Sequence, residues 1–112
     1  MLRALTNIAL KEGISRVVRQ IMELFHPQKV ILFGSYAYGE PHEGSDLDLL
    51  VVTPKPPPQG EVWKVAYEFG KHLPIPLQIF FMSPEEFEET KDVVGGLAYP
   101  AHHWGMVLYE NS

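Results

Sequence analysis

The sequence predicts an α+β fold, a two-layer α/β arrangement in which helices pack mainly on one face of a small mixed β-sheet. Residues 30–33 are a short, continuously apolar segment, as a strand buried on both faces is, and a second apolar strand over residues 47–52 carries one acid, Asp48, near its start. Residues 14–25 and 62–73 instead repeat their apolar side chains at helical spacing. Because 112 residues with 46% hydrophobic content allow one modest core, we expect a single domain spanning residues 1–112.

The two predicted helices have recognisable ends. Pro27 stops the first helix before the strand that follows it. Residues 1–11 also carry apolar side chains at helical spacing, and two interpretations stay open for them: a separate helical turn, or a partner-binding arm. A proline-rich connector at residues 53–60 precedes the second helix, and Pro74 follows its end.

The last third of the chain predicts a strand, a helix and an apolar terminal segment. Residues 75–82 alternate as a strand would, with Gln78 on the face opposite Leu77 and Ile79. Residues 83–86, Ser-Pro-Glu-Glu, have the sequence of a capping box and therefore predict a helix start. Helical structure is also expected for residues 93–104, although two glycines and a proline weaken it. Residues 106–109 are either a closing strand or an apolar tail.

The segment between the first two strands carries the chemistry. Asp46 and Asp48 stand two residues apart at the head of the second strand, so both carboxylates emerge on one face, roughly 7 Å apart. Two carboxylates beside an apolar core repel each other, and burial raises the pKa of each. A divalent cation such as Mg²⁺ resolves both problems, because it prefers oxygen ligands and keeps both groups ionised.

Gly34 and Ser35 end the first strand abruptly and supply the second half of a candidate site. If Ser35 starts a helical turn, its hydroxyl and the free backbone N–H groups can bind phosphate oxygens. Gly34 permits a close approach to the backbone. A phosphate-binding turn beside a metal-binding pair of acids is suited to the transfer of a nucleotidyl group.

These residues carry a family resemblance. The Gly34-Ser35 turn, ten intervening residues and Asp46-Leu47-Asp48 resemble the signature of the DNA polymerase beta-like nucleotidyltransferase superfamily. In so short a chain the pattern resembles the minimal nucleotidyltransferase branch, whose members often pair with a HEPN-domain protein in toxin–antitoxin operons. The resemblance covers most of the chain.

The resemblance implies an activity and its participants. Asp46 and Asp48 would be the catalytic, metal-binding residues for Mg²⁺ or Mn²⁺, and Gly34 and Ser35 would bind the nucleotide. ATP would be the donor of an AMP group, and a tyrosine hydroxyl on a HEPN toxin partner, encoded nearby, would be the acceptor. The chain would then act as an antitoxin.

Gln78 departs from the family pattern. Active members usually carry a third acid on the third strand, and the matching position here holds an amide, which cannot act as a base. Loss of this acid should weaken turnover more than nucleotide binding. The alternative function is therefore a catalytically weak, nucleotide-binding antitoxin that neutralises its partner by binding alone.

Composition narrows the remaining functions. A net charge of −5 argues against a nonspecific nucleic-acid binder. The absence of cysteine excludes thiol catalysis and agrees with a cytoplasmic location, and no segment is long and apolar enough to span a membrane. The exposed edges of the sheet are candidate surfaces for association into a homo-oligomer.

Several other side chains attract attention. Acids at residues 85–92 predict a solvated helix face, or alternatively a surface for a basic partner. His102 and His103 are interpreted as a surface pair whose adjacent side chains do not converge on one ion. Trp63 and Trp104 are interpreted as core or interface anchors, and His42 as a solvated loop residue.

Overall fold

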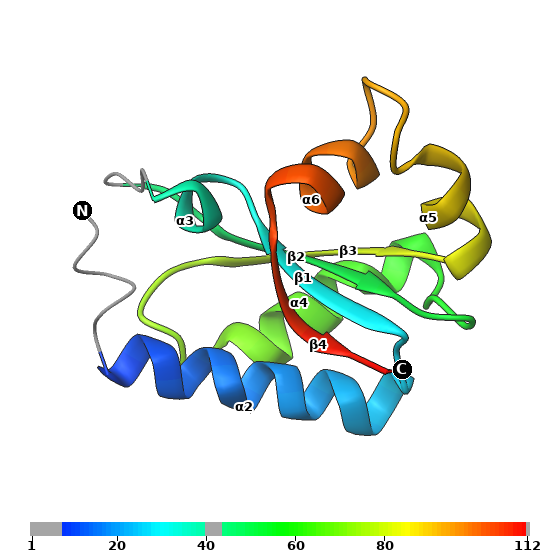
Figure 1. Cartoon of the computed structure of the whole chain (residues 1–112). Helices are drawn as coiled ribbons and strands as arrows, with labels where there is room; N and C mark the ends of the chain where they lie inside the picture. Colours follow the sequence, from blue (N-terminus) through cyan, green and yellow to red (C-terminus); the bar gives the residue numbers. More distant parts are fainter. Residues whose placement is uncertain (1–7, 40–43, 112) are drawn as a thin grey trace.

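A four-stranded mixed sheet forms the centre of the computed structural model, which describes residues 8–39 and 44–111 (Figure 1). Its strands lie in the order β3-β2-β1-β4. β1 pairs in antiparallel fashion with β2 and with β4, whereas β2 and β3 are parallel. The strands are β1 (Lys29–Phe33), β2 (Leu47–Val52), β3 (Leu77–Met82) and β4 (Met106–Glu110). The predicted mixed sheet is confirmed, and residues 106–109 are the closing strand rather than a tail.

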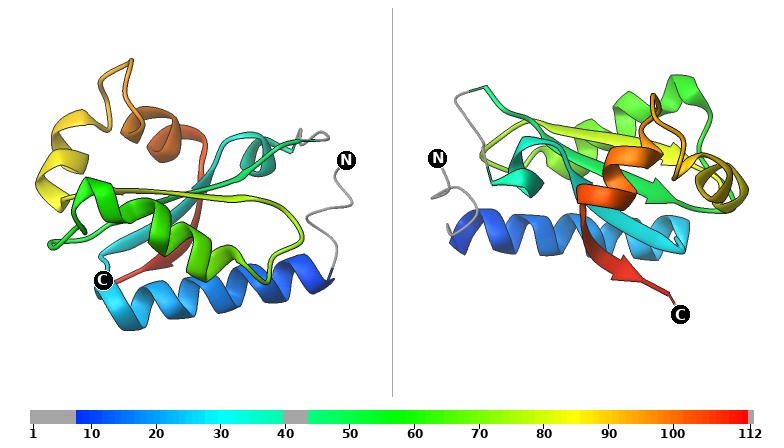
Figure 2. Two further views of the ribbon diagram at one scale, coloured as in Figure 1. Left: turned by 180° about the vertical axis from the view of Figure 1, so that it is seen from behind. Right: turned by 45° about the horizontal axis from the view of Figure 1, so that its top comes forward.

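The two longest helices cover one face of the sheet. α2 (Ile8–Phe25) and α4 (Val62–Gly70) lie together beneath it (Figures 1 and 2). Their apolar residues, such as Val17 and Ile21, pack against alternate strand residues, such as Leu49. This helical layer explains the 3.6-residue periodicity of the sequence.

α2 begins earlier than the sequence predicted. Residues 8–11 continue the main helix and do not form a separate helical turn. The rest of the proposed arm, residues 1–7, lies outside the described residues, as does His42. Among the helices described, none has both the length and the apolar character needed to cross a bilayer.

Two short helices cover part of the other face. α5 (Pro84–Thr90) and α6 (Ala98–Trp104) bury Phe87, Ala98 and Ala101 against the strand residues Ile31 and Leu50. Helix α3 (Ser35–Tyr38) lies at one end of the sheet, and the short 3-10 helix η1 (Gln59–Glu61) leads into α4 (Figure 1). Residues 91–97, which include Gly95 at φ 119°, separate α5 from α6, so the expected helix over 93–104 is shorter than predicted.

The start of α5 is capped as the sequence predicted. Ser83 is the N-cap residue, and its hydroxyl accepts a hydrogen bond of 3.1 Å from the backbone N–H of Glu86. Pro84 occupies the first turn, where its missing N–H costs no helical hydrogen bond. The cap fixes the direction of α5 as it leaves β3.

Replacement of the cap tests this local structure. Ser83→Ala should lower the free energy of unfolding by about 1 kcal/mol, because it removes the acceptor for an otherwise unpaired N–H. Urea denaturation of both proteins measures the difference. Ser15→Ala, an exposed change within α2, is the control and should have little effect; equal stability of Ser83→Ala and the wild type would contradict the assignment.

Candidate functional site

Strand pairing places two site residues, Asp48 and Gln78, side by side at one end of the sheet. Phe33, the last residue of β1, pairs with Asp48, and Asp48 pairs on its other side with Gln78 of β3. Asp48 alternates with Leu50 along β2 and therefore faces the α5–α6 side of the sheet. Asp46 lies just before the first residue of β2 and is half-buried.

Gly34 lies directly against the carboxylate of Asp48. Its φ of 82° belongs to the left-handed region that glycine adopts without strain. A Cβ atom at this position would collide with Oδ2 of Asp48. The sequence predicts that Gly34 lets a phosphate approach the backbone closely. The structure adds a second reason for glycine at this position, because a side chain here would occupy the space of the Asp48 carboxylate.

Asp48 is held in a setting that disfavours its charge. Its Oδ1 atom is buried and has no hydrogen-bond partner among the described residues. Burial, and secondarily the negative charge of Asp46, raise the pKa of Asp48 from 3.8 to about 6. A buried carboxylate oxygen without a donor is costly unless another group binds it.

The donor set fits a divalent cation with oxygen ligands. Asp46 and Asp48 supply adjacent carboxylates, and a cation beside them would satisfy the unpartnered oxygen and offset the mutual repulsion. Gln78 lies beside Asp48 in the register and is exposed, so its amide oxygen is the neutral group at this position.

The turn after β1 has the predicted helical form. Ala37 and Tyr38 donate their backbone N–H groups to the carbonyl oxygen of Gly34 at 3.0 and 3.1 Å. Ser35 is the first residue of α3 and is half-buried. Tyr36 is 4% exposed and packs in the core, so it does not present a ring for stacking.

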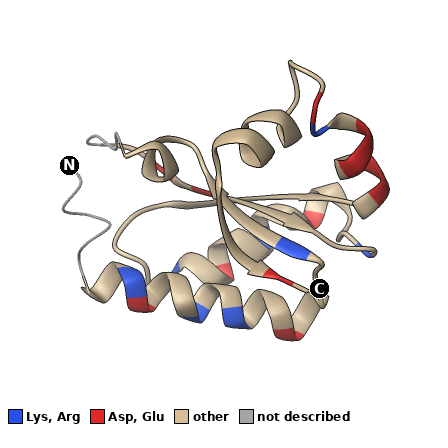
Figure 3. Ribbon diagram, viewed as in Figure 1, with Lys and Arg blue, Asp and Glu red and all other residues tan. Residues whose placement is uncertain are grey.

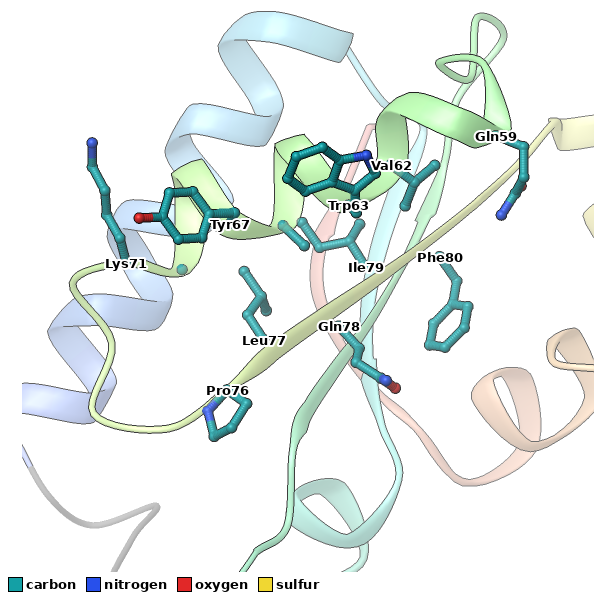
Figure 4. Close-up of a pocket in the computed structure, with 12 residues that line it drawn as sticks. Gln59, Val62, Trp63, Tyr67, Lys71, Pro76, Leu77, Gln78, Ile79 and Phe80 are labelled. Atoms are coloured by element: carbon teal, nitrogen blue, oxygen red, sulfur yellow. The ribbon is translucent and has the colours of Figure 1, made fainter.

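A cavity formed by the described residues lies along the outer edge of β3. This groove of about 660 Å³ runs between α4 and β3 and reaches Gln78 at the site (Figure 4). Figure 4 shows Gln78 and Phe80 on the opposite side of the strand from Leu77 and Ile79, as the alternation predicted. The sequence does not predict the groove, because it forms only where the edge strand β3 packs beside the helix α4.

The tryptophans are not in the core. Trp63 is 65% exposed beside the groove, and Trp104 is 59% exposed, 6.4 Å from the ring of Tyr38. The core interpretation is therefore wrong for both, because each lies on the outer surface of its helix. A role as interface anchors stays a prediction.

The structure extends the interpretation of the histidine pair. His102 and His103 are exposed, as expected, and the fold adds Asp92 beside them. Their ligand atoms and that of Asp92 all lie within 4.8 Å of one another. The proximity of Asp92 to the two histidines depends on the fold, which places the α5–α6 connection against α6.

Several solved structures share the fold of this chain. A structure described as a toxin–antitoxin with AMP-PNP superimposes with a TM-score of 0.68 at 20% identity, covering 91% of this chain and 74% of that one. The toxin–antitoxin MntA-HepT superimposes with a TM-score of 0.64 at 15% identity, covering 90% and 73%. A putative nucleotidyltransferase from Sulfolobus solfataricus gives a TM-score of 0.56 at 17% identity, covering 93% and 83%.

The sequence match then identifies the family. Residues 14–97 match the family described as Nucleotidyltransferase domain, and the match includes the Gly34–Ser35 turn, both acids and Gln78. The chain belongs to this family. No curated protein sequence matches it.

The buried carboxylate predicts a particular pH dependence of stability. Because folding raises the pKa of Asp48 from 3.8 to about 6, the folded state binds more protons than the unfolded state between these values. Stability contributed by this group should therefore fall as pH rises from about 4 to 6. Asp48→Asn should remove this loss and be more stable than the wild type at pH 7.5 by about 1–2 kcal/mol, after allowance for solvent screening.

Urea denaturation in EDTA at pH 4 and pH 7.5 measures this difference. Glu85→Gln, an exposed change on α5, is the control for loss of one negative charge. Parallel pH dependence of the wild type and Asp48→Asn would show that the carboxylate carries no such cost.

Proposed function

We propose that the chain is a Mg²⁺-dependent nucleotidyltransferase that transfers AMP from ATP to a hydroxyl acceptor, a tyrosine of a HEPN-domain toxin, and thereby acts as an antitoxin. The observation that carries the proposal is the half-buried carboxylate of Asp48, whose Oδ1 has no partner among the described residues. It lies between Gly34 and Gln78, and the charge of Asp46 acts on it. Family membership supports the reaction class.

Each half of the site has an assigned role. Asp46 and Asp48 would hold Mg²⁺ or Mn²⁺, since both prefer oxygen ligands. Ser35 and the turn at Gly34 would bind the triphosphate, because the N–H groups of Ser35 and Tyr36 precede the first hydrogen-bonded donors of α3. When bound, the cation would neutralise the negative charge that makes attack on a triphosphate slow.

The reaction is a substitution at phosphorus. The acceptor oxygen forms a bond to the α-phosphorus, the bond from that phosphorus to the bridging oxygen breaks, and pyrophosphate leaves with the electron pair. The hydroxyl proton passes to solvent, because Gln78 cannot accept it. The side chains of the site contribute orientation and charge neutralisation rather than a covalent intermediate.

The structural neighbours support a toxin as the partner. They include toxin–antitoxin structures, one of them with AMP-PNP, and this chain shares their fold. The resemblance of the Gly34, Ser35, Asp46 and Asp48 pattern to minimal nucleotidyltransferases supports a HEPN-domain protein as that toxin.

A specific observation favours a second candidate function. Gln78, an uncharged amide, occupies the position directly beside Asp48, where a third carboxylate would complete the acidic cluster. Without it the site can bind nucleotide yet turn over slowly. The chain would then neutralise the toxin by occupying it.

Nucleotide binding tests what both candidates share. Wild-type protein should bind ATP in the presence of Mg²⁺ and lose most of this binding in EDTA, as measured by isothermal titration calorimetry. The double change Asp46→Asn, Asp48→Asn should abolish the Mg²⁺-dependent part, because it removes both carboxylates. Glu85→Gln, Glu89→Gln on exposed α5 removes the same charge and should leave binding unchanged; retention of Mg²⁺-dependent binding by the Asp46, Asp48 variant would refute the site.

Transfer separates the two candidates. Intact mass spectrometry of the co-purified HEPN partner, incubated with ATP and Mg²⁺, should show one or more added AMP groups if the chain is an enzyme. Tight complex formation without a mass increase supports neutralisation by binding. Gln78→Asp should raise the rate at least about tenfold, because positioned acid–base groups typically contribute 10²–10⁴-fold.

Gln78→Asn is the matched control for that variant, because it has the length of aspartate without its charge. It should not raise the rate. Equal rates for Gln78→Asp and Gln78→Asn, with folds intact by circular dichroism, would show that the missing charge is not what limits transfer.

A further inference from the structure

Three metal-ligating side chains meet on the surface at a distance along the chain from the acid pair. Asp92 lies in the α5–α6 connection, and His102 and His103 lie in the last turn of α6. One ligand atom from each lies within 4.8 Å of the others. The two imidazole rings have centroids 4.9 Å apart and are nearly perpendicular, at 74°.

We propose that Asp92, His102 and His103 form a zinc site that ties the α5–α6 connection to the end of α6. Zn²⁺ binds imidazole nitrogen and carboxylate oxygen at about 2.0–2.2 Å, so tetrahedral ligand atoms lie about 3.5 Å apart. Nε2 of His103 and Oδ1 of Asp92 are already 2.9 Å apart. Coordination would require side-chain rotations that bring the third ligand atom, now within 4.8 Å of the other two, to about 3.5 Å from them.

The two histidine rings are supported by aromatic neighbours. The ring of Phe87, which is 2% exposed, meets His102 edge-on at 5.9 Å. The ring of Tyr99 lies 4.4 Å from that of His103, tilted by 39°. Such contacts restrict ring rotation, so part of the entropic cost of arranging the ligands is met by folding.

The surrounding charge favours a cation. Exposed acids cover α5, which contacts α6 (Figure 3). One of them, Glu88, forms an ion pair of 2.8 Å with Lys91, the cation adjacent to Asp92 in the chain. The remaining acids, Glu85, Glu86 and Glu89, leave this region net negative, and such a surface raises the local concentration of divalent cations.

The ion would restrain a part of the chain that has few packing contacts. Val93 and Val94, in the connection that arches away from the sheet in Figure 2, are 56% and 77% exposed. The connection ends at α6, which packs Ala98 and Ala101 against the sheet. A ligand that binds only the folded arrangement stabilises it by mass action, so zinc should raise the melting temperature.

The ligand types distinguish this site from the acid pair. Mg²⁺ prefers oxygen ligands and binds imidazole poorly, whereas zinc accepts both nitrogen and oxygen. The acid pair can also attract Zn²⁺, so the experiment uses the Asp46→Asn, Asp48→Asn protein as its background. The test of the zinc site therefore does not depend on the proposed transferase function.

Equilibrium dialysis against ZnCl₂ should find one Zn²⁺ bound per chain in that background, undisturbed by excess MgCl₂. Loss of an outer-shell partner typically weakens metal affinity about 10- to 100-fold. Loss of a direct ligand should weaken it at least as much, so the affinity for Zn²⁺ should fall at least tenfold in each of Asp92→Asn, His102→Ala and His103→Ala. His72→Ala, a change of another exposed histidine, is the control and should bind zinc as the background does.

Stability completes the test, because the exposed positions of the three ligands allow their variants to fold. In EDTA the variants and the background should have similar urea midpoints, which reports any purely structural effect of the substitutions. Zinc should raise the melting temperature of the background and of His72→Ala but not of the three ligand variants. Absence of zinc binding in the background, or equal affinity in the ligand variants, would overturn the proposal.

Discussion

The pairing of β1 with β2 is the constraint on which the site depends. It places Asp48 opposite Phe33, so the carboxylate meets the chain where β1 turns away through Gly34. Both strands are buried on both faces, and a slip of one residue would turn Asp48 toward the layer of α2 and α4. Such a slip would bury a carboxylate among leucine and valine side chains, which is too costly to compete with the observed register.

The same pairing creates an acid whose Oδ1 has no hydrogen-bond partner within residues 8–39 and 44–111. The Asp48 pKa of about 6 and its unpartnered oxygen both follow from placing a carboxylate at the end of a buried strand, beside another acid. Unfavourable local environments of this kind concentrate at functional sites, where a ligand offsets the cost. A positively charged ligand would offset this cost, and the turn that follows β1 lies beside the same carboxylate.

The parallel addition of β3 brings an uncharged side chain to the acid pair. It places Gln78 beside Asp48, so the neighbour of this carboxylate on β3 is a neutral amide. The outer edge of β3 is unpaired within the described sheet, and the groove beside it leads from the site to exposed Trp63. Gln78 at the candidate site and a candidate contact surface therefore lie on the same strand, β3. The histidine cluster lies on α6, on the other side of the sheet from α4.

The sequence by itself determined the elements whose signals are local. Apolar residues marked β1 and β2, and the alternation within residues 75–82 assigned the two faces of β3. Ser83 located the start of α5, because its hydroxyl accepts a hydrogen bond from the backbone N–H three residues further on. The spacing of Gly34, Ser35, Asp46 and Asp48 also indicated the family. Only the tertiary structure decided that Gly34 packs against Asp48, that Gln78 is the neighbour of Asp48, and that Asp92 meets His102 and His103. These contacts join residues from separate elements, and their geometry is fixed by strand register and helix packing, which depend on the summed burial of the whole core rather than on any local pattern.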